Sequence, residues 1–441
     1  MFETIAVFLA AVVAGIIGGL LPGVGGFVVM ITAFPLLVHL DPVNVILFYV
    51  VMISLDQYFN NTSAILMGMP GVSTSIPTLI EGHTMFRRGE GDKAIMFSAI
   101  SSWICSAFGV IFILLCLPIL FLFYKLWNSS VQAIIFALTF LSIVLFSPNK
   151  VWINCFLFFG GLFLGWVGFD EAYNTHNLTF HWPPLYDGLP TMSVIVALFV
   201  LPKFLQSYFN NHTTVIWPKL TIGKYLQSFK KITKYRATLF RSGLIGSVGG
   251  FVPGLTYTAS SIFAYYIEKL YRRDKYKEGD IRCLIASEGS NNAGVFTQMI
   301  PLLFLGIPIT ASEALIYNIL EMKGVPLTLE WFQNTFILVV GCFMLSSTIG
   351  LFVAGKYINL FSFLHGISIS KIYIFVASLL LFMIWWLGNV TMNGWDNLLI
   401  TGILAVIGLT LIRLDTSPLI FGFLLHDTIF WVFKRLYVIY F

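Results

Sequence analysis

Small polar side chains accompany helix-breaking residues at two distant places in this sequence of 441 residues. In the first, Asn60-Asn61-Thr62-Ser63 precedes Pro70-Gly71, and in the second, Asn291-Asn292 precedes Gly306-Ile307-Pro308. A broken helix leaves N–H groups free at the start of one half and carbonyl groups free at the end of the other. The first end attracts anions and the second suits hard cations. The pattern therefore predicts a site for a small anion and an accompanying cation.

The two places belong to an internal repeat. Gly15–Gly23 matches Gly246–Gly254 at five of nine positions, with an offset of 231 residues (15 to 246). The asparagine pairs share this offset, whereas the Gly-x-Pro motifs are 238 apart (68 to 306), which implies an insertion of seven residues. An isolated motif of this kind is typical of helix kinks and close packing, but duplication favours a binding role. The candidate binding residues are Pro22, Gly23, Asn60, Asn61, Thr62, Ser63, Pro70, Gly71, Ser73, Pro253, Gly254, Thr256, Asn291, Asn292, Gly306 and Pro308.

A few ionisable side chains stand in otherwise apolar surroundings. Asp56 and Glu288 lie close to the asparagine pairs, and Glu313, His426 and Asp427 lie farther away. A carboxylate at membrane depth is a functional candidate by default, so Asp56 and Glu288 are candidates for ion or proton coupling. The alternative is that each lies at an interface or is hydrogen-bonded inside a helical bundle.

The composition indicates what must position these residues. Of all residues, 58% are apolar, 16% are aromatic and only 10% are charged, and the mean hydropathy is +0.88. Soluble chains carry roughly 25% charged residues. A soluble enzyme, a nucleic-acid-binding protein and a disordered chain are therefore excluded. We expect an all-α polytopic membrane protein with room for roughly ten to twelve spans, each needing about 20 apolar residues.

Basic residues are concentrated in a few loops. Seven lie between Lys219 and Arg241 without an acid among them, six more lie between Lys269 and Arg282, and Arg87, Arg88 and Lys93 form a smaller group. The positive-inside rule predicts that these loops are cytoplasmic. The segment 170–189 has no Lys or Arg and suits the external face. The sequence thus divides into a first half over 1–208, a basic cytoplasmic linker over 209–241 and a second half over 242–441.

The charge pattern also predicts the orientation of the two copies. The basic loop 269–282 corresponds to residues 39–44 of the first copy, which contain no Lys or Arg. The repeats are therefore expected to be inverted, as in many secondary transporters. The segment 242–267 lies between two basic loops and is too short for two spans, so we expect a re-entrant hairpin with its tip at Pro253-Gly254. An elevator-like carrier would move such hairpins against the remaining helices.

Enzyme signatures are absent from the sequence. The run Gly350–Lys356 has the outline of a P-loop, but Tyr357 follows where Ser or Thr is required. The five cysteines are scattered, and no pair has the spacing of a metal or redox site. We therefore expect no enzymatic activity and no cofactor other than co-transported Na⁺ or H⁺, with transport driven by an ion gradient or by a separate subunit.

The motifs resemble the large membrane subunit of the tripartite tricarboxylate transporters. The similarity covers about residues 12–435 in order and is strongest at 15–25, 63–71, 81–89, 161–170, 186–190 and 300–308. It implies uptake of di- or tricarboxylates across the bacterial inner membrane, together with a small membrane subunit and an extracytoplasmic solute-binding protein. The family's Pro-Gly, Asn-Asn and Gly-Ile-Pro positions carry over to Pro22-Gly23, Pro70-Gly71, Pro253-Gly254, Asn291-Asn292 and Gly306–Pro308.

The sequence departs from the family pattern beside these motifs. Residues 56–61 replace a small, glycine-rich stretch, and Ile309 stands where another glycine is usual. These differences cluster at the proposed site, where the carboxylate and the coupling ion would bind. The alternative functions are a stand-alone carboxylate carrier, an ion exchanger or a channel, each without a binding protein. A small organic anion and the lipid bilayer are the expected partners, and no nucleic acid is expected.

Overall fold

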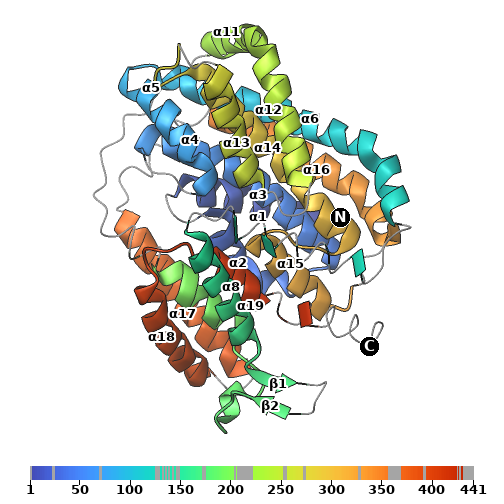
Figure 1. Cartoon of the computed structure of the whole chain (residues 1–441), viewed down its shortest axis with the longest axis vertical. Coiled ribbons are helices and arrows are strands. Elements are labelled where there is room, and N and C mark those ends of the chain that lie inside the picture. The colour runs from blue at the N-terminus through green and yellow to red at the C-terminus, as the bar shows by residue number, and fades with distance from the viewer. Residues whose placement is uncertain are drawn as a thin grey trace.

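The computed structural model is almost entirely helical (Figure 1). It describes residues 2–21, 25–68, 72–124, 149–170, 175–202, 222–251, 256–271, 275–325, 329–355, 369–390 and 394–424, with scattered positions between 130 and 145 and at 205, 426, 429 and 430. The turns at Pro22-Gly23, Pro70-Gly71 and Pro253-Gly254 and the side chain of Asp427 lie outside the described residues. The expectation of an all-α membrane protein is confirmed, with a short two-stranded sheet as one small exception.

The elements of the first half are α1 (Phe2–Leu20), α2 (Gly25–Leu37), α3 (Pro42–Met67), η1 (Ser73–Ser75), α4 (Ile76–Thr78), η2 (Leu79–His83), α5 (Thr84–Arg87), α6 (Gly91–Tyr124), α8 (Val151–Gly165), β1 (Gly168–Asp170), β2 (Thr175–Asn177), η3 (Pro183–Leu185), α9 (Thr191–Ile195) and η4 (Val196–Val200). Strands β1 and β2 pair antiparallel, with Gly168 opposite Asn177. They lie in the polar segment for which the sequence predicted only a loop.

The remaining elements are α11 (Ile222–Ile232), η5 (Thr233–Tyr235), α12 (Arg236–Phe251), α13 (Tyr257–Tyr271), α14 (Ile281–Leu305), α15 (Ala311–Met322), α16 (Leu329–Gly355), α17 (Ile369–Val390), α18 (Gly394–Thr410) and α19 (Ser417–Leu424). Helix α12 begins inside the basic stretch that we expected to be a linker. Helices α12 and α13 have 16 and 15 residues and pack against each other, with a break between them. Each is shorter than the roughly 20 residues of a full span.

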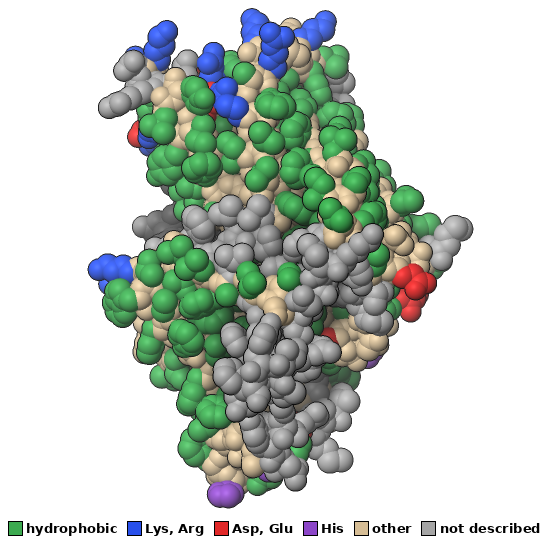
Figure 2. All heavy atoms as spheres, turned by 45° about the vertical axis from the view of Figure 1, so that its right-hand side comes forward, with side chains coloured by type: hydrophobic (Ala, Val, Ile, Leu, Met, Phe, Trp, Pro, Cys, Tyr) green, Lys and Arg blue, Asp and Glu red, His purple; other side chains and the backbone are tan. Residues whose placement is uncertain are grey.

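The surface has the character of a membrane protein. Among the residues that the structure describes, four helices are long and apolar enough to cross a bilayer, namely α1, α3, α6 and α16. Along α6, Leu115, Ile119 and Leu122 are each more than 60% exposed, which water would disfavour and lipid would not. Figure 2 shows apolar side chains over much of one face, with Lys and Arg gathered at one end of the molecule. The chain is therefore a multi-pass membrane protein.

A row of glycines on α1 lets it approach α3 closely, and a similar row on α12 lets it approach α14. We call these rows the glycine stripes. A Cβ at Gly15 or Gly19 of α1 would lie 2.5 Å from the carbonyl oxygen of Met52 or Asp56 on α3. On α12, a Cβ at Gly246 would lie 2.2 Å from the carbonyl oxygen of Ser290, and one at Gly250 would lie 2.4 Å from that of Gly294, both on α14. Glycines four residues apart thus form the α1–α3 contact and the α12–α14 contact, as is common between membrane helices.

The structure corrects the alignment of the two copies. The contacted carbonyls are 238 residues apart in both cases (52 to 290 and 56 to 294), and so are Gly68 and Gly306, which end α3 and α14 in left-handed conformations. The seven-residue insertion therefore precedes α14. The expectation that Asn60-Asn61 and Asn291-Asn292 occupy equivalent positions is wrong: the first pair begins eight residues before its glycine cap and the second begins fifteen before.

The two copies are intertwined. Helix α3 packs against α16 of the other half, and α14 packs against α6; likewise α2 packs against α15, while α13 packs against η1 and α4. Helices α1–α6 and α11–α16 pack together around α3 and α14 and form a first group. A second group, made of α8, α9–η4, α17, α18 and α19, lies toward the end of the long axis opposite α11 (Figure 1). Helices α2 and α15 connect the groups by contacting α17 and α19, respectively.

The glycine stripe of α12 yields a stability prediction. In Gly250→Ala the new methyl group meets the oxygens of Gly294 and Thr297 at 2.4 Å, so α12 and α14 must separate. We expect a loss of about 1–3 kcal/mol, seen as a lower midpoint of thermal unfolding in detergent. Gly341→Ala is the control, because a Cβ there has no neighbour within 4 Å. Equal midpoints for the two variants would contradict this account of the contact.

Candidate functional site

Polar side chains meet where α3 and α14 cross in the centre of the first group of helices. Every residue from Asn44 to Leu66 and from Cys283 to Phe304 is buried, so both helices are surrounded by protein on all sides. Such helices are normally apolar throughout. These two instead bury a set of polar groups, namely Asp56, Gln57, Asn60, Asn61, Glu288, Ser290, Asn291, Asn292, Thr297 and Gln298.

Direct hydrogen bonds join the two helices. The amide of Asn61 donates to the carboxylate of Glu288, and Nδ2 of Asn291 donates to Oε1 of Gln57 at 3.0 Å. The first pairing brings together two residues 227 apart in the sequence, and the second brings together two residues 234 apart. The asparagine of each predicted motif therefore contacts a polar side chain on the other long helix.

The residues that follow Pro70-Gly71 border the α3–α14 contact on a third side, which we call the third wall. Thr74 donates from Oγ1 to Oε1 of Gln57 at 3.3 Å, and Thr78 donates to the carboxylate of Glu288. From α13, the Ser261 hydroxyl lies 3.1 Å from the Ser287 carbonyl oxygen and 3.5 Å from that of Thr74. The two broken-helix regions of the chain therefore approach the same α3–α14 contact.

Helix α6 closes the fourth side. Nδ2 of Asn292 donates to Oγ of Ser102 at 2.8 Å and to the backbone oxygen of Glu288 at 3.1 Å. The Glu288 side chain also faces Ser98 and Ser102. Asn292 thus ties α14 to α6, whereas Asn291 points toward α3.

Several buried oxygens in this region have no hydrogen-bond partner among the described residues. They are Oδ1 of Asn60, Asn61 and Asn291, Oγ of Ser290, Oγ of Ser75 on η1, and Oδ1 of Asp56, which faces α1. Leaving a buried polar group without a partner costs about 1–3 kcal/mol. A cluster of such groups around two buried helices is a candidate binding site, because a ligand would provide the missing partners.

Asp56 is enclosed by α1 and α2. Its carboxylate accepts from Nε2 of Gln57 at 3.1 Å, and a Cβ on Gly26 would lie 3.2 Å from Oδ2. None of the ion pairs among the described residues involves Asp56 or Glu288. An unpaired charge in the interior is costly, so both carboxylates are suited to binding a proton or a cation.

The other sequence candidates have local structural partners. The hydroxyls of Thr62 and Ser63 donate to carbonyls of their own helix, and Thr256 caps the start of α13 by accepting from the Ala259 amide. Gly306 ends α14, Pro308 is buried in the turn that follows, and Ser73 begins η1. These residues shape the backbone around the site.

Glu313 and His426 have the structural roles that were the alternative interpretation. The Glu313 carboxylate accepts from the amides of Ile309 and Thr310 in a capping box at the start of α15, and also from Gln298 and Tyr49. Its hydrogen-bonding capacity is thus used by protein groups. The ring of His426 packs beside Gly165.

Glu81 is a buried acidic residue that sequence reasoning passed over. It lies in η2 and accepts from the Tyr276 hydroxyl at 2.7 Å, from the Tyr265 hydroxyl at 3.1 Å, and from the Gly279 and Asp280 amides at 2.6 and 2.8 Å. It therefore fastens the basic loop 275–280 and the start of α14 to the segment that forms the third wall. In the sequence, the signal that could have identified Glu81 is its position at the start of the 81–89 motif.

Comparison with known proteins gives a consistent result. The family model described as "Tripartite tricarboxylate transporter TctA family" matches residues 5–421. A similar protein from Agrobacterium vitis is described as "Uncharacterized 52.8 kDa protein in TAR-I ttuC' 3'region". It is 26% identical over 318 residues, which cover 71% of this chain and 63% of that relative. This chain thus spans less than two thirds of the length of that relative. No solved structure matches.

The four hydrogen bonds at Glu81 lead to a second prediction. Glu81→Ala removes the acceptor of the Tyr276 hydroxyl and of the Gly279 and Asp280 amides, so trypsin should cleave after the exposed Lys275 and Lys277 several times faster in the purified protein. Glu90→Ala is the control, because Glu90 is half exposed and pairs with Lys93 on its own segment. Unchanged cleavage in Glu81→Ala would show that other contacts hold the loop.

Proposed function

Because the chain belongs to the tripartite tricarboxylate transporter TctA family, we propose that it imports small organic anions of the di- or tricarboxylate class, driven by an ion gradient. It would be the large subunit of an inner-membrane carrier, working with a small membrane subunit and an extracytoplasmic solute-binding protein. The observation that carries the proposal is the set of unpartnered oxygens and amides between α3 and α14.

Neutral groups would recognise the anion. Among the described residues, Nδ2 of Asn60 and the hydroxyls of Ser75 and Ser290 have no protein partner and can donate to an anion. The amide nitrogens of Asn61 and Asn291 already donate to Glu288 and Gln57. Helices α2 and α13 begin at Gly25 and Tyr257, a few residues after the Pro-Gly pairs of the sequence, and the start of a helix carries partial positive charge. A carboxylate substrate matches both features.

A cation would balance the charge of the substrate. No lysine or arginine is among the buried residues that the structure describes in this interface. The oxygens of Asn61, Asn291 and Ser75 are the kind of ligand that Na⁺ prefers, and Asp56 and Glu288 supply negative charge for Na⁺ or for a proton. Binding of the cation would make binding of the anion favourable, which is the physical basis of symport.

The arrangement of the helices supports an elevator-like movement. The site lies wholly in the first group of helices, and α2 and α15 form the contact with the second group. One part of this contact is the edge-on packing of Phe27 against Phe199, whose ring centres are 4.9 Å apart. Apolar contacts can slide without breaking hydrogen bonds, so the first group could carry the site across the membrane.

The intertwined packing supports inverted repeats. Helix α3 of the first half packs on α16 of the second, and α14 of the second half packs on α6 of the first. Such an exchange of partners is what a pseudo-two-fold axis in the membrane plane would require. Both basic regions flanking the α12–α13 hairpin would then lie in the cytoplasm, and the β1–β2 loop would face outward.

Uptake by vesicles tests the transport proposal. In Asn61→Ala with Asn291→Ala, two amides of the interface are lost, and we expect uptake of labelled di- and tricarboxylates to fall at least about tenfold. The measurement uses right-side-out vesicles from cells that produce the chain with its partner subunits, with and without a Na⁺ gradient. Asn44→Ala is the control, because Asn44 is also buried but hydrogen-bonds with Glu3. Unchanged uptake in the double variant would contradict the proposed site.

Cysteine accessibility tests the orientation. In a background without native cysteines, Lys231→Cys and Lys277→Cys should both react with an impermeant thiol reagent only from the cytoplasmic side, whereas His176→Cys should react only from outside. All three positions are exposed. Labelling of the two lysine positions from opposite faces would exclude a re-entrant α12–α13 hairpin.

A further inference from the structure

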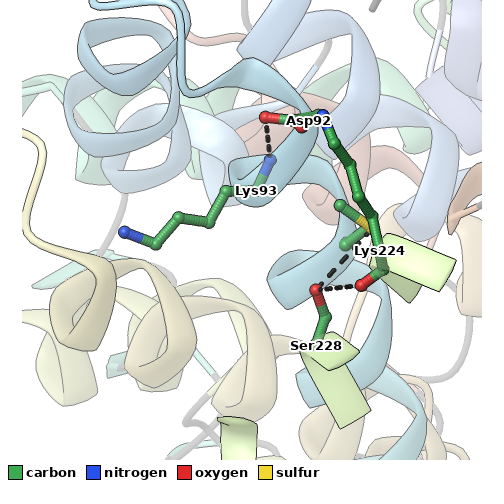
Figure 3. A network of polar contacts seen from close by, with 5 residues as sticks. Asp92, Lys93, Lys224 and Ser228 are labelled. Atoms are coloured by element: carbon green, nitrogen blue, oxygen red, sulfur yellow. Dashed lines mark hydrogen bonds and ion pairs between the residues drawn. The ribbon is translucent and has the colours of Figure 1, made fainter. Parts of the chain in front are cut away.

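Helix α11 lies outside the bundle, at the end of the molecule where basic side chains gather (Figures 1 and 2). Its inner face is fixed to the long helices: Tyr225 donates to the Leu351 carbonyl at 3.1 Å, and Tyr225 and Ile232 are almost completely buried. The Lys224 ammonium lies 2.6 Å from Asp92 at the start of α6, and Ser228 donates to the backbone oxygen of Lys224 (Figure 3). The helix is therefore firmly seated on α6 and α16.

The outer side of the same region carries positive charge without counterions. Lys230, Lys231, Lys234 and Arg236 are exposed, and none of them belongs to an ion pair among the described residues. Residues 222–241 contain no acidic residue. Asp92 pairs only with Lys224, which lies at the start of α11, away from Lys230 and Lys231 at its end. Anions from outside the protein are the natural partners of the remaining charges.

A hollow lies beside these charges. It has a volume of about 750 Å³ and is lined by Ile104 of α6, Ile232, Thr233 and Lys234 of α11–η5, and Arg236 and Leu239 of α12. Three of the lining residues are aliphatic, and the two cationic ones follow each other closely along the chain. The lining is thus both apolar and positively charged, and its size suits a small-molecule ligand.

An apolar stripe continues from the hollow along α12. Phe240, Leu244 and Val248 follow Arg236 at intervals of four residues, so all four lie on one face of the helix. These three apolar side chains are 59%, 40% and 40% exposed. The stripe from Arg236 to Val248 is about 18 Å long at 1.5 Å per residue, which is close to half of the roughly 30 Å hydrocarbon thickness of a bilayer.

We propose that this hollow and stripe form a binding site for an anionic phospholipid in the cytoplasmic leaflet. The phosphate lies between Lys234 and Arg236, and one acyl chain follows Phe240, Leu244 and Val248. A free phosphate or a soluble organic anion would use the cations and leave the stripe uncovered, whereas a zwitterionic lipid would cover the stripe and leave the net positive charge unbalanced. A lipid with a net negative charge satisfies both parts.

Such a lipid would link α11 to the first helix of the hairpin. The hollow lies at the junction of α11 with α12, and α12 carries the glycine stripe that packs on α14. The bound lipid therefore holds the cytoplasmic end of α12 against α6 and α11. The site is separate from the α3–α14 interface, so it can be tested independently of transport.

Native mass spectrometry of the full-length protein tests the proposal. The protein is reconstituted in mixed phosphatidylcholine–phosphatidylglycerol bilayers and then extracted. We expect retained phosphatidylglycerol on the unmodified protein and at least about tenfold less on Lys234→Gln with Arg236→Gln. Lys275→Gln with Lys277→Gln is the matched control, because it removes two exposed charges from another basic loop and should leave retention unchanged. Circular dichroism of each variant verifies folding.

Two further arms separate the possible ligands. In the first, Phe240→Asn should also reduce phosphatidylglycerol retention, although both cations stay in place. In the second, phosphatidylglycerol should raise the midpoint of thermal unfolding, whereas glycerol phosphate alone should not. Equal retention by the two double variants would overturn the proposal in favour of general charge attraction. Equal retention of phosphatidylcholine, or equal stabilisation by glycerol phosphate, would overturn it in favour of an apolar surface or a soluble-anion site.

Discussion

A polar contact at membrane depth governs this structure. Helices α3 and α14 are buried on all sides, and their amides and carboxylates bind one another and polar side chains of η1, α4 and α6. In a region of low dielectric constant such groups must be satisfied or must receive a ligand. The hydrogen bonds of Asn61 with Glu288 and of Asn291 with Gln57 satisfy part of the set. The oxygens left without partners mark the place where binding would lower the free energy.

The surrounding elements are built to bring this contact about. Glycine stripes on α1 and α12 remove the side chains that would keep these helices away from α3 and α14. Breaks in the chain then bring Thr74, Thr78 and Ser261 to the interface, where an unbroken helix would direct them elsewhere. Irregular backbone of this kind is stable at membrane depth only when it is buried in protein or lines a wet cavity. Thr74, Thr78 and Ser261, the described residues that follow the breaks, are all buried.

The charged residues fall into three groups with different tasks. Glu81 and Glu313 are buried acids that accept from backbone amides, so they fasten a loop and cap a helix. Asp56 and Glu288 lie within α3 and α14 at the candidate site, where their partners are side-chain amides and a hydroxyl. The basic residues of α11 and η5 are exposed and face outward, where the headgroups of a membrane would lie. The small number of charged residues is therefore divided among loop and helix-end contacts, the candidate site and the basic surface.

The sequence alone determined the membrane location, the helical class, the repeat and the candidate polar residues, because these depend on composition and on local motifs. It also indicated the family, which the match over residues 5–421 confirms. It could not determine the register of the repeat, since a shift of seven residues is nearly two helical turns and keeps a side chain on the same face. The asparagine pairs therefore matched in the sequence although they lie about two turns apart on corresponding helices. Only the tertiary structure decided that Asn291 rather than Asn292 faces α3, that Glu313 is a helix cap and that Glu81 holds a distant loop. Each of these depends on which helix faces cross, and that is fixed by packing between segments 190 or more residues apart or by caps formed in three dimensions.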